Sequence, residues 1–295
     1  MPDVVPPTEE VNPRSVDLDL LDTRELVETI VADQHTAVDA VLAQSETIAR
    51  VVDDIADRLD SGGRLHYVGA GSSGRLGMLD AAEMPPTFGM PPELVRAHVA
   101  GGIDALVRAV EGAEDDAAAG IAVADDFVND GDVVLGISAS GSAAFVVTAI
   151  ERAKEKGALT IALTSAADSA VARAAEMAVI LETGAEVLAG STRLKAGTAQ
   201  KIALNAISTA VMVRLNKIYD NLMVDVVASN RKLRARAIRL IQRLADVDER
   251  RASDLLLMAQ GRVKAAVVME RCGVGPKEAQ SLLDCHDGSL RAVLE

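Results

Sequence analysis

Aromatic side chains are scarce in this sequence. It has no tryptophan, two tyrosines and three phenylalanines among 295 residues. Because 49% of the residues are hydrophobic, a core of alanine, valine, leucine and isoleucine can still form. Single-stranded nucleic acids are commonly held on aromatic rings, and the formal net charge of −14 would repel a phosphate backbone. We therefore expect no nucleic-acid partner.

Cysteines and long apolar runs are also lacking. The two cysteines, Cys272 and Cys285, are not spaced as CxxC, and structural zinc normally needs four clustered ligands, so we expect reduced thiols and no metal. No window reaches the roughly 18 apolar residues of a membrane span. The N-terminal MPDVVPPTEEVNPRS has neither the basic start nor the apolar core of a signal peptide. These absences predict a cytoplasmic protein without a membrane segment.

The stretch around which the remaining chain is organised is residues 65–89, LHYVGAGSSGRLGMLDAAEMPPTFG. An apolar run at 65–68, three glycines and the helix-compatible residues 75–82 predict a strand, a glycine-rich turn and a helix. Because the first amides of a helix are unpaired, the turn is predicted to hold an anion, most simply a phosphate. The bend Met84-Pro85-Pro86 is expected to end the helix and to hold Glu83 at a fixed place.

The letters GAGSSG at 69–74 also satisfy the dinucleotide pattern GxGxxG. That pattern requires an acidic residue about twenty positions later, at the end of a second strand, to bind the ribose hydroxyls. Here the second apolar run, 95–99, ends in Ala-Gly-Gly with no acid. We therefore expect no nicotinamide or flavin cofactor, and the two serines in the turn suit a phosphate monoester better.

Five short apolar runs alternate with helical stretches: residues 65–68, 95–99, 132–137, 159–163 and 178–181. This alternation predicts an α/β fold, a five-stranded parallel sheet flanked by helices on both faces. Ligands of such sheets bind beyond the carboxyl ends of the strands. The turns that follow the strands are therefore where chemistry is expected.

The domain organisation follows from the flanking segments. Residues 1–17 are expected to be a flexible tail, and residues 18–244 to form the main α/β domain, including N-terminal helices from 21 and from about 35 to 61. A long helix is expected to run to about Val227. Residues 245–295 are expected to form a small all-helical C-terminal domain without chemistry of its own.

Two further segments are rich in polar groups. The third apolar run ends in GISASGSA, whose serines and glycine offer hydroxyl donors and free amides at the start of a helix predicted at 143–156. Residues 184–201 read GAEVLAGSTRLKAGTAQK, where Thr192 is a possible helix cap. Arg193, Lys195 and Lys201 supply cations there in an otherwise acidic chain, with Lys201 expected on a solvated face.

These motifs resemble those of one known family. GAGSSGRLGMLDAAEMPPTFG, EGAEDD at 111–116, GISASGS and GAEVLAGSTRLKAGTAQK look like the N-acetylmuramic acid 6-phosphate etherases, and LDTRELVETI near the start extends the match to nearly the whole chain. That family belongs to the sugar isomerase (SIS) fold group and is related to the glucokinase regulatory protein. The resemblance implies a flavodoxin-like SIS fold and a homodimer.

The implied reaction is a lyase reaction in the recycling of cell-wall sugar. The D-lactyl ether at carbon 3 of N-acetylmuramic acid 6-phosphate would be eliminated and water added, giving N-acetylglucosamine 6-phosphate and D-lactate. In the ring-opened aldehyde the neighbouring carbonyl acidifies the proton on carbon 2, so a carboxylate can remove it. A second carboxylic acid can protonate the departing ether oxygen and then activate water, so two carboxylates suffice without a metal or cofactor.

By the same resemblance, the general acid matches Glu83 and the base matches Glu114. Glu83 lies in AAEMPPTFG, and burial among its apolar neighbours is expected to raise its pKa, as a general acid needs at neutral pH. Glu114 lies in EGAEDD, where Glu111, Asp115 and Asp116 are rival carboxylates.

The resemblance also implies a set of substrate contacts. Ser138, Ser140, Gly141 and Ser142 would hold the 6-phosphate, Ser72 and Ser73 would line the sugar or phosphate side, and Ser191 and Lys195 would be secondary contacts. The phosphate turn of this fold group usually reads SxSGxT, whereas Ala143 occupies the last position here. Either Ser142 supplies the missing hydroxyl or phosphate is bound less tightly.

The distance along the predicted helix constrains the site. If residues 74–83 form one continuous helix, Glu83 lies about 15 Å from the glycine-rich turn. We therefore expect the phosphate in the turn at 138–142. Glu83 would then either follow an early break in the helix or face a pocket shared between subunits.

Two other classes of function remain open. A non-catalytic phosphosugar-binding regulatory protein would keep the serine turns without needing Glu83 and Glu114, whereas a phosphosugar isomerase would need a base but would release no lactate. An assay for D-lactate separates these alternatives from the etherase.

Overall fold

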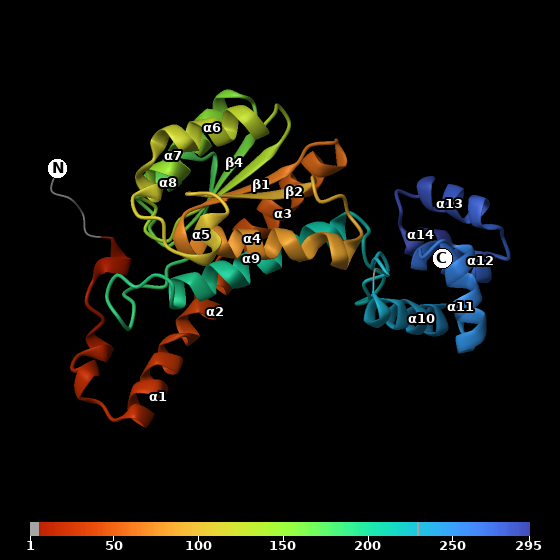
Figure 1. The fold of residues 1–295 in the computed structure, drawn as a ribbon, viewed down its shortest axis with the longest axis horizontal. Coiled ribbons are helices and arrows are strands. Elements are labelled where there is room, and N and C mark those ends of the chain that lie inside the picture. The colour runs from red at the N-terminus through yellow and green to blue at the C-terminus, as the bar shows by residue number, and fades with distance from the viewer. Residues whose placement is uncertain (1–5, 229) are drawn as a thin grey trace. The chain divides into compact units, whose positions relative to one another are not determined.

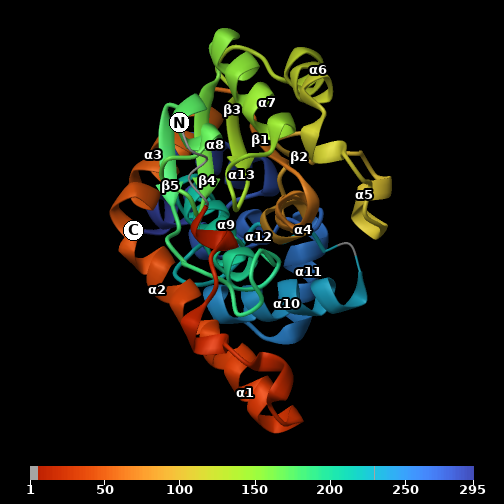
Figure 2. The ribbon, with the colours of Figure 1, turned by 90° about the vertical axis from the view of Figure 1, so that its left-hand side faces the viewer.

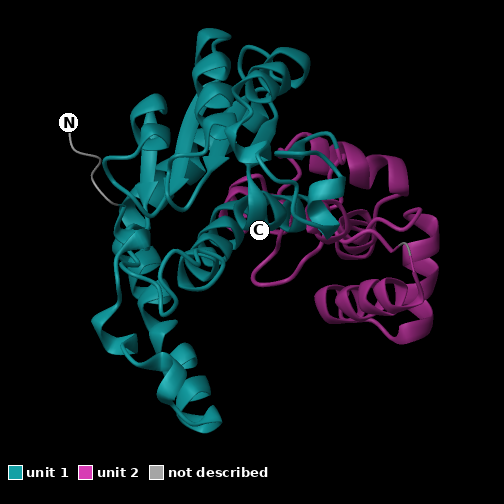
Figure 3. Ribbon diagram, turned by 60° about the vertical axis from the view of Figure 1, so that its left-hand side comes forward, with its two compact units in different colours: residues 1–81, 93–208 teal, residues 82–92, 209–295 magenta. Residues whose placement is uncertain are grey.

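The structure is a computed structural model that describes residues 6–228 and 230–295. Its contacts divide the chain into two compact units (Figure 3). The first comprises Met1–Ala81 and Glu93–Ser208, and the second comprises Ala82–Pro92 and Thr209–Glu295. The division into domains predicted at 17/18 and 244/245 stays a prediction.

A five-stranded parallel sheet lies at the centre of the first unit. Its strands are β1 (Leu65–Gly69), β2 (Val95–Val99), β3 (Val133–Ile137), β4 (Leu159–Thr164) and β5 (Met177–Ile180). They pair in the order β2-β1-β3-β4-β5, all parallel, so the predicted fold class is confirmed (Figure 1). The chain passes from β1 outward to β2 on one side and then returns past β1 to β3 on the other side. Sheets of this kind bind ligands at the point where the strand order reverses in this way.

Helices cover both faces of this sheet. The helices of the first unit are α1 (Thr23–Asp33), α2 (His35–Ala43), α3 (Ser45–Asp60), α4 (Gly71–Phe88, whose last turns belong to the second unit), α5 (Asp104–Val107), α6 (Ala117–Phe127), α7 (Ala144–Glu155), α8 (Ala170–Ala174) and α9 (Lys195–Arg214, which also continues into the second unit). Helices α6, α7 and α8 lie on one face, and α3, α4 and α9 on the other (Figure 1). Alternate strand residues therefore face different helices: Val68 and Val134 pack in one cluster with Ile150 of α7.

Two helix boundaries differ from the sequence prediction. The helix expected from 35 to about 61 is interrupted at Gln44, which has a non-helical conformation and separates α2 from α3. The long helix expected to reach Val227 ends at Arg214. Asn216 adopts a left-handed conformation (φ 59°), and the amide of Lys217 bonds to the carbonyl of Met212 at 2.9 Å, a Schellman-type end.

The N-terminal segment contacts the body of the first unit. Three short 3₁₀ turns lie at Pro7–Glu9, Pro13–Ser15 and Leu18–Leu20. Thr8 and Asn12 are buried, and the Asn12 amide donates to the Asp33 carboxylate at 3.1 Å. The flexible tail therefore stays a prediction only for residues 1–5, which lie outside the described residues. Helices α1 and α2 extend away from the sheet (Figure 2).

The second unit is helical apart from its connecting loops. It contains α10 (Arg231–Ala245), α11 (Glu249–Met258), α12 (Val263–Cys272), α13 (Pro276–Asp284) and α14 (Leu290–Leu294), packed around a core that includes Ile241, Leu255 and Val267. No helix within residues 6–228 and 230–295 is long and apolar enough to cross a membrane.

Candidate active site

The turn after β1 requires its glycines because the end of the strand and the start of α4 approach closely. A Cβ atom added to Gly74 would lie 2.6 Å from the carbonyl oxygen of Gly69, and one added to Gly69 would lie 2.7 Å from the nitrogen of Gly74. The predicted order of strand, turn and helix is confirmed, although α4 already begins at Gly71. Ser72 and Ser73 therefore lie in its first turn.

Helix α4 does not end at the prolines as predicted. It continues through Pro85 and Pro86 to Phe88, and the amide of Gly89 still bonds to the carbonyl of Pro85 at 2.9 Å. Proline removes two amide donors, but its fixed φ is compatible with a helix, and the burial of Met84 and Phe88 on one face holds the last turns.

This continuity changes the expected setting of Glu83. An early helix break is excluded, because α4 is helical throughout Gly71–Phe88. The predicted burial among Met84, Pro85 and Phe88 is also wrong: Glu83 is exposed, while Met84 and Phe88 point into the core. Glu83 is therefore presented to the outside of the chain from the last turns of the helix.

The turn after β3 has the features of an anion site. Gly141 has a left-handed conformation (φ 70°), and its amide donates to the Ser138 hydroxyl at 3.1 Å. The hydroxyls of Ser140 and Ser142 lie 2.9 Å apart. The N-cap of α7 is Ala143, which has no side-chain acceptor, so the first amides of α7 stay available for an anion. The departure from the SxSGxT pattern thus removes a hydroxyl and leaves those amides uncapped.

The segment after β2 carries Glu114. This residue lies in a 3₁₀ turn, Ala113–Asp115, and is exposed. A cavity of about 250 Å³ is lined by Ser72, Arg75, Glu111 and Glu114, among others, so the structure brings Ser72 and Glu114 together. Glu111 remains a rival carboxylate in the same cavity.

Asp116 has a structural role instead. Its carboxylate accepts from the amide of Ala119 at 2.9 Å and so caps α6. This removes one of the three rivals of Glu114.

Strand order explains how these groups converge. Strands β3, β1 and β2 are consecutive neighbours in the sheet, so the turns that follow them lie side by side at one edge. Neighbouring strands are about 4.8 Å apart. The serine turn and the glycine turn therefore lie side by side, and the cavity lined by Ser72 and Glu114 places the Glu114 segment next to the glycine turn.

Two residues predicted to contact substrate are instead engaged with the protein. Ser73 is buried, and its hydroxyl donates to the Gln200 side chain at 2.9 Å, which ties α4 to α9. Lys195 is 1% exposed, and its ammonium lies 3.0 Å from the Asp33 carboxylate. Ser191 lies half-buried in the turn before α9.

Sequence reasoning missed Glu186, which organises the start of α9. Its buried carboxylate accepts from the amides of Lys195 (3.1 Å) and Ala196 (2.9 Å), the capping role that the sequence suggested for Thr192. Burial raises the pKa of Glu186, and these amides oppose the rise.

Sequence reasoning also missed Asp80. This buried carboxylate accepts from Tyr67 (3.0 Å), Asn205 (2.6 Å) and Ser208 (3.1 Å), and so joins β1, α4 and α9. Burial raises its pKa, and the three hydrogen bonds counteract the rise. Its place on the same helical face as Ser73 and Met84 is a signal that could have identified it.

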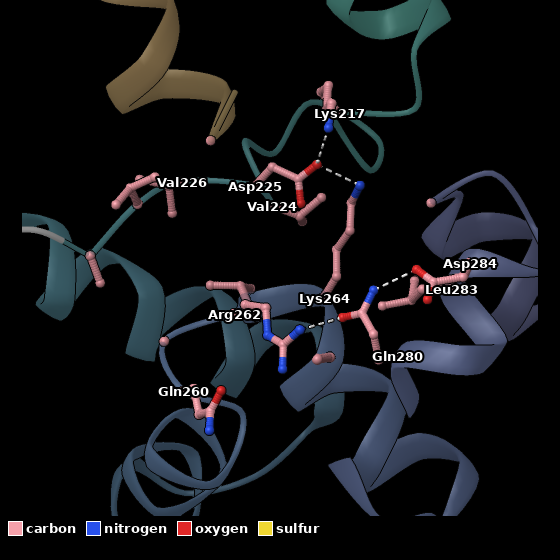
Figure 4. Close-up of a pocket in the computed structure, with 17 residues that line it drawn as sticks. Lys217, Val224, Asp225, Val226, Gln260, Arg262, Lys264, Gln280, Leu283 and Asp284 are labelled. Carbon is pink, nitrogen blue, oxygen red and sulfur yellow. Dashed lines mark hydrogen bonds and ion pairs between the residues drawn. The ribbon is translucent and has the colours of Figure 1, made fainter. Parts of the chain in front are cut away.

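A larger cavity lies within the second unit (Figure 4). It encloses about 520 Å³, and two of its cationic side chains have partners within the cavity. Lys264 lies 2.7 Å from the carboxylate of Asp225, and Arg262 donates to the side-chain oxygen of Gln280 at 2.7 Å. Burial lowers the pKa of Lys264, and Asp225 opposes this effect. None of the site residues predicted from sequence lines this cavity.

Known families match successive parts of the chain. Residues 47–154 match the glucokinase regulatory protein N-terminal SIS domain, residues 116–210 match the SIS domain, and residues 220–267 match the C-terminal lid domain of glucokinase regulatory protein. These matches agree with the sheet and the helical second unit described above.

Individual relatives match over nearly the full length. An N-acetylmuramic acid 6-phosphate etherase from Nostoc sp. (strain PCC 7120) is 49% identical, covering 97% of this chain and 94% of the relative. The protein of the same description from Synechocystis sp. (strain PCC 6803) is 46% identical, covering 98% and 95%. A solved structure of a phosphoheptose isomerase from Francisella tularensis is 18% identical with a TM-score of 0.49, covering 65% of this chain and 98% of that chain, a likeness too low to support a functional argument.

Proposed function

The chain belongs to the N-acetylmuramic acid 6-phosphate etherase family, and on this premise we propose that it cleaves the D-lactyl ether of N-acetylmuramic acid 6-phosphate. The products are N-acetylglucosamine 6-phosphate and D-lactate, and the reaction is an elimination followed by addition of water. The observation that carries the proposal for this site is the cavity that Ser72 and Glu114 line together, beside the serine turn after β3.

The 6-phosphate binds in the turn at 138–142. Support comes from the paired hydroxyls of Ser140 and Ser142, the left-handed Gly141 and the uncapped start of α7. Neutral donors of this kind can hold a dianion without a large positive field. From there the open sugar chain extends past the glycine turn, where Ser72 can donate to a sugar oxygen.

Glu114 then removes the proton from carbon 2. Its position in the cavity beside Ser72 supports this role, and its exposure in the free chain leaves the carboxylate accessible to the sugar. The electron pair left on carbon 2 moves to form the bond to carbon 3 as the carbon–oxygen bond to lactate breaks. The aldehyde carbonyl at carbon 1 stabilises the charge that develops in this step.

Glu83 donates a proton to the departing ether oxygen and then, as a carboxylate, activates the water that adds to carbon 3. We propose that it serves a pocket shared with a second copy of the chain, because α4 has no early break. An exposed apolar face supports a homodimer: Val27 and Val31 on α1 and Val38 and Leu42 on α2 are 47–64% exposed at helical spacing. Sedimentation of the purified protein tests the dimer.

The experiment that tests the function uses labelled water. In D₂O, elimination and readdition place deuterium at carbon 2 of the sugar, and in H₂¹⁸O they place the heavy oxygen at carbon 3. Hydrolysis by attack on the lactyl carbon would instead place ¹⁸O in lactate. Mass measurement of both products therefore tests both the cleavage and its route.

The same experiment tests the alternatives. A phosphosugar-binding regulatory protein would leave the substrate intact, and a phosphosugar isomerase would exchange the carbon 2 proton without releasing lactate. Absence of D-lactate would overturn the proposal. A cytoplasmic location is part of the proposal as well, supported by two free, exposed cysteines, Cys272 and Cys285, which suit a reducing compartment.

A further inference from the structure

A second groove adjoins the cavity that contains Glu114. It encloses about 460 Å³ between α4 and the start of α9. Its lining residues are Ser72, Arg75, Leu76, Leu79, Arg193, Gly197, Thr198 and Lys201. Among these described residues three are cationic and none is acidic, in a chain whose net charge is −14. The groove is therefore a local positive site that an anionic group would enter favourably.

The cations of the groove differ in how they are held. Arg75 donates to the carbonyl oxygens of Ala105 (2.8 Å) and Arg108 (3.3 Å), so its guanidinium is fixed in place and contributes mainly charge. Arg193 and Lys201 are exposed. They are therefore free to reach a ligand in the groove.

Asp80 is near Lys201 but does not neutralise its charge in the groove. It interacts with Lys201 electrostatically, but it is buried and takes its hydrogen bonds from Tyr67, Asn205 and Ser208. The ammonium of Lys201 is thus available to an anion at the surface.

The groove also has an apolar wall. Leu76 and Leu79 follow Ser72 and Arg75 on one face of α4, at spacings of three and four residues. Leu79 is 55% exposed, so its side chain offers apolar surface to a ligand beside the three cations. The groove thus combines a place for an anion with a place for a small apolar group.

Two residues connect this groove to the proposed reaction site. Ser72 and Arg75 line both the groove and the cavity that contains Glu114. A ligand whose reacting carbons lie between Ser72 and Glu114 can therefore extend a short substituent into the groove. The lactyl ether at carbon 3 is such a substituent, with one carboxylate and one methyl group.

We propose that this groove binds the lactyl group of the substrate, with Arg193 and Lys201 pairing with its carboxylate and Leu76 and Leu79 contacting its methyl group. The inference rests on the proposed function and names what selects the substrate over its product, which lacks this group. It also explains how two anions come together: the cations offset the repulsion between the lactyl carboxylate and Glu114, which must approach the adjacent carbon.

The test compares two ligands on variants of exposed residues. Arg193→Met and Lys201→Met keep an unbranched aliphatic stem and remove the charge. We expect each to lower kcat/KM for N-acetylmuramic acid 6-phosphate by roughly 10- to 100-fold, the usual loss of a hydrogen bond to a charged group. Binding of N-acetylglucosamine 6-phosphate should change less than about twofold by the same reasoning, and this also shows that the variants fold. Lys154→Met on α7 is the matched control at a distant exposed lysine.

A substrate analogue provides the decisive comparison. In the analogue the lactyl carboxylate is replaced by a carboxamide, which has no charge. Wild type should bind it about 10- to 100-fold more weakly than the substrate, whereas Arg193→Met should discriminate between the two much less. If replacing the carboxylate by the carboxamide weakened binding equally in wild type and in Arg193→Met, the lactyl assignment would be overturned. Loss of N-acetylglucosamine 6-phosphate binding in the variants would overturn it as well. Failure of wild type to release D-lactate would instead overturn the proposed function.

Discussion

The guanidinium of Arg75 donates a hydrogen bond of 2.8 Å to the carbonyl oxygen of Ala105. Arg75 lies in the first turns of α4, and Ala105 lies in the segment between β2 and Glu114. The bond therefore joins the glycine-rich turn to the segment that carries the proposed base. The two sides of the candidate site are held together by a side chain from the motif itself.

Arg75→Ala should therefore impair the step in which carbon 2 loses its proton. We expect kcat to fall by up to about 100-fold with a smaller change in KM, because Glu114 would be misplaced while the phosphate turn stays intact. The measurement is the rate of deuterium exchange at carbon 2 in D₂O. Added guanidinium at low millimolar concentration should restore part of the rate; unchanged exchange in Arg75→Ala would contradict the positioning role.

Deuterium exchange at carbon 2 and release of D-lactate, measured together, distinguish the role of Glu114 from that of Glu83. Glu114→Gln should abolish both, with a loss on the order of 10²- to 10⁴-fold, because removal of the proton comes first. Glu83→Gln should retain exchange but lose lactate release. Glu111→Gln is the matched control within the same cavity. If Glu111→Gln rather than Glu114→Gln stopped exchange, the base would be Glu111.

A pair of histidines predicts how stability depends on pH. The Nδ1 atom of His66 lies 3.1 Å from Nε2 of His98, and Asp132 lies 3.3 Å from the other nitrogen of His66. Burial lowers the pKa of His66, an effect that Asp132 opposes, and burial together with the charge of His66 lowers the pKa of His98 to about 4. The folded state therefore resists protonation, while the unfolded chain takes up protons below about pH 6.5.

Stability from these histidines is thus present above about pH 6.5 and is lost as pH falls toward 4. Between pH 7 and pH 5 we expect His98 to account for roughly 1 to 2 kcal/mol of the decrease in unfolding free energy. Urea denaturation of wild type and of His98→Gln at both pH values measures this contribution to the free energy of unfolding. The variant should lose less stability than wild type on acidification, and an equal loss would show that His98 does not contribute.

The fold could be predicted from local sequence patterns, whereas only part of the candidate site could be predicted in this way. The apolar runs and glycine turns identified five strands and the edge where Ser72, Glu114 and Ser140 lie. The end of α4 could not be predicted locally, because proline disfavours a helix. The helix nevertheless continues to Phe88, and the burial of Met84 stabilises its last turns. Tertiary packing overrides propensity at such places.

Long-range polar partners were likewise beyond local patterns. Lys195 is paired with Asp33, 162 residues earlier in the chain, and no spacing rule connects them. A lysine in a polar, glycine-rich segment is equally consistent with substrate binding and with a buried ion pair. The three-dimensional structure distinguishes these two roles, because it places the ammonium of Lys195 beside the carboxylate of Asp33.

Lys195→Met therefore tests structure against substrate binding. Removing the buried partner leaves Asp33 with Arg14, an exposed side chain 3.9 Å away, as its remaining cation, so we expect the free energy of unfolding to fall by about 3 kcal/mol. The double variant Lys195→Met with Asp33→Asn should recover part of this loss, because neither charge is then buried alone. For the fraction that stays folded, KM for N-acetylmuramic acid 6-phosphate should change little. A large rise in KM with unchanged stability would instead mean that Lys195 leaves Asp33 to contact the substrate.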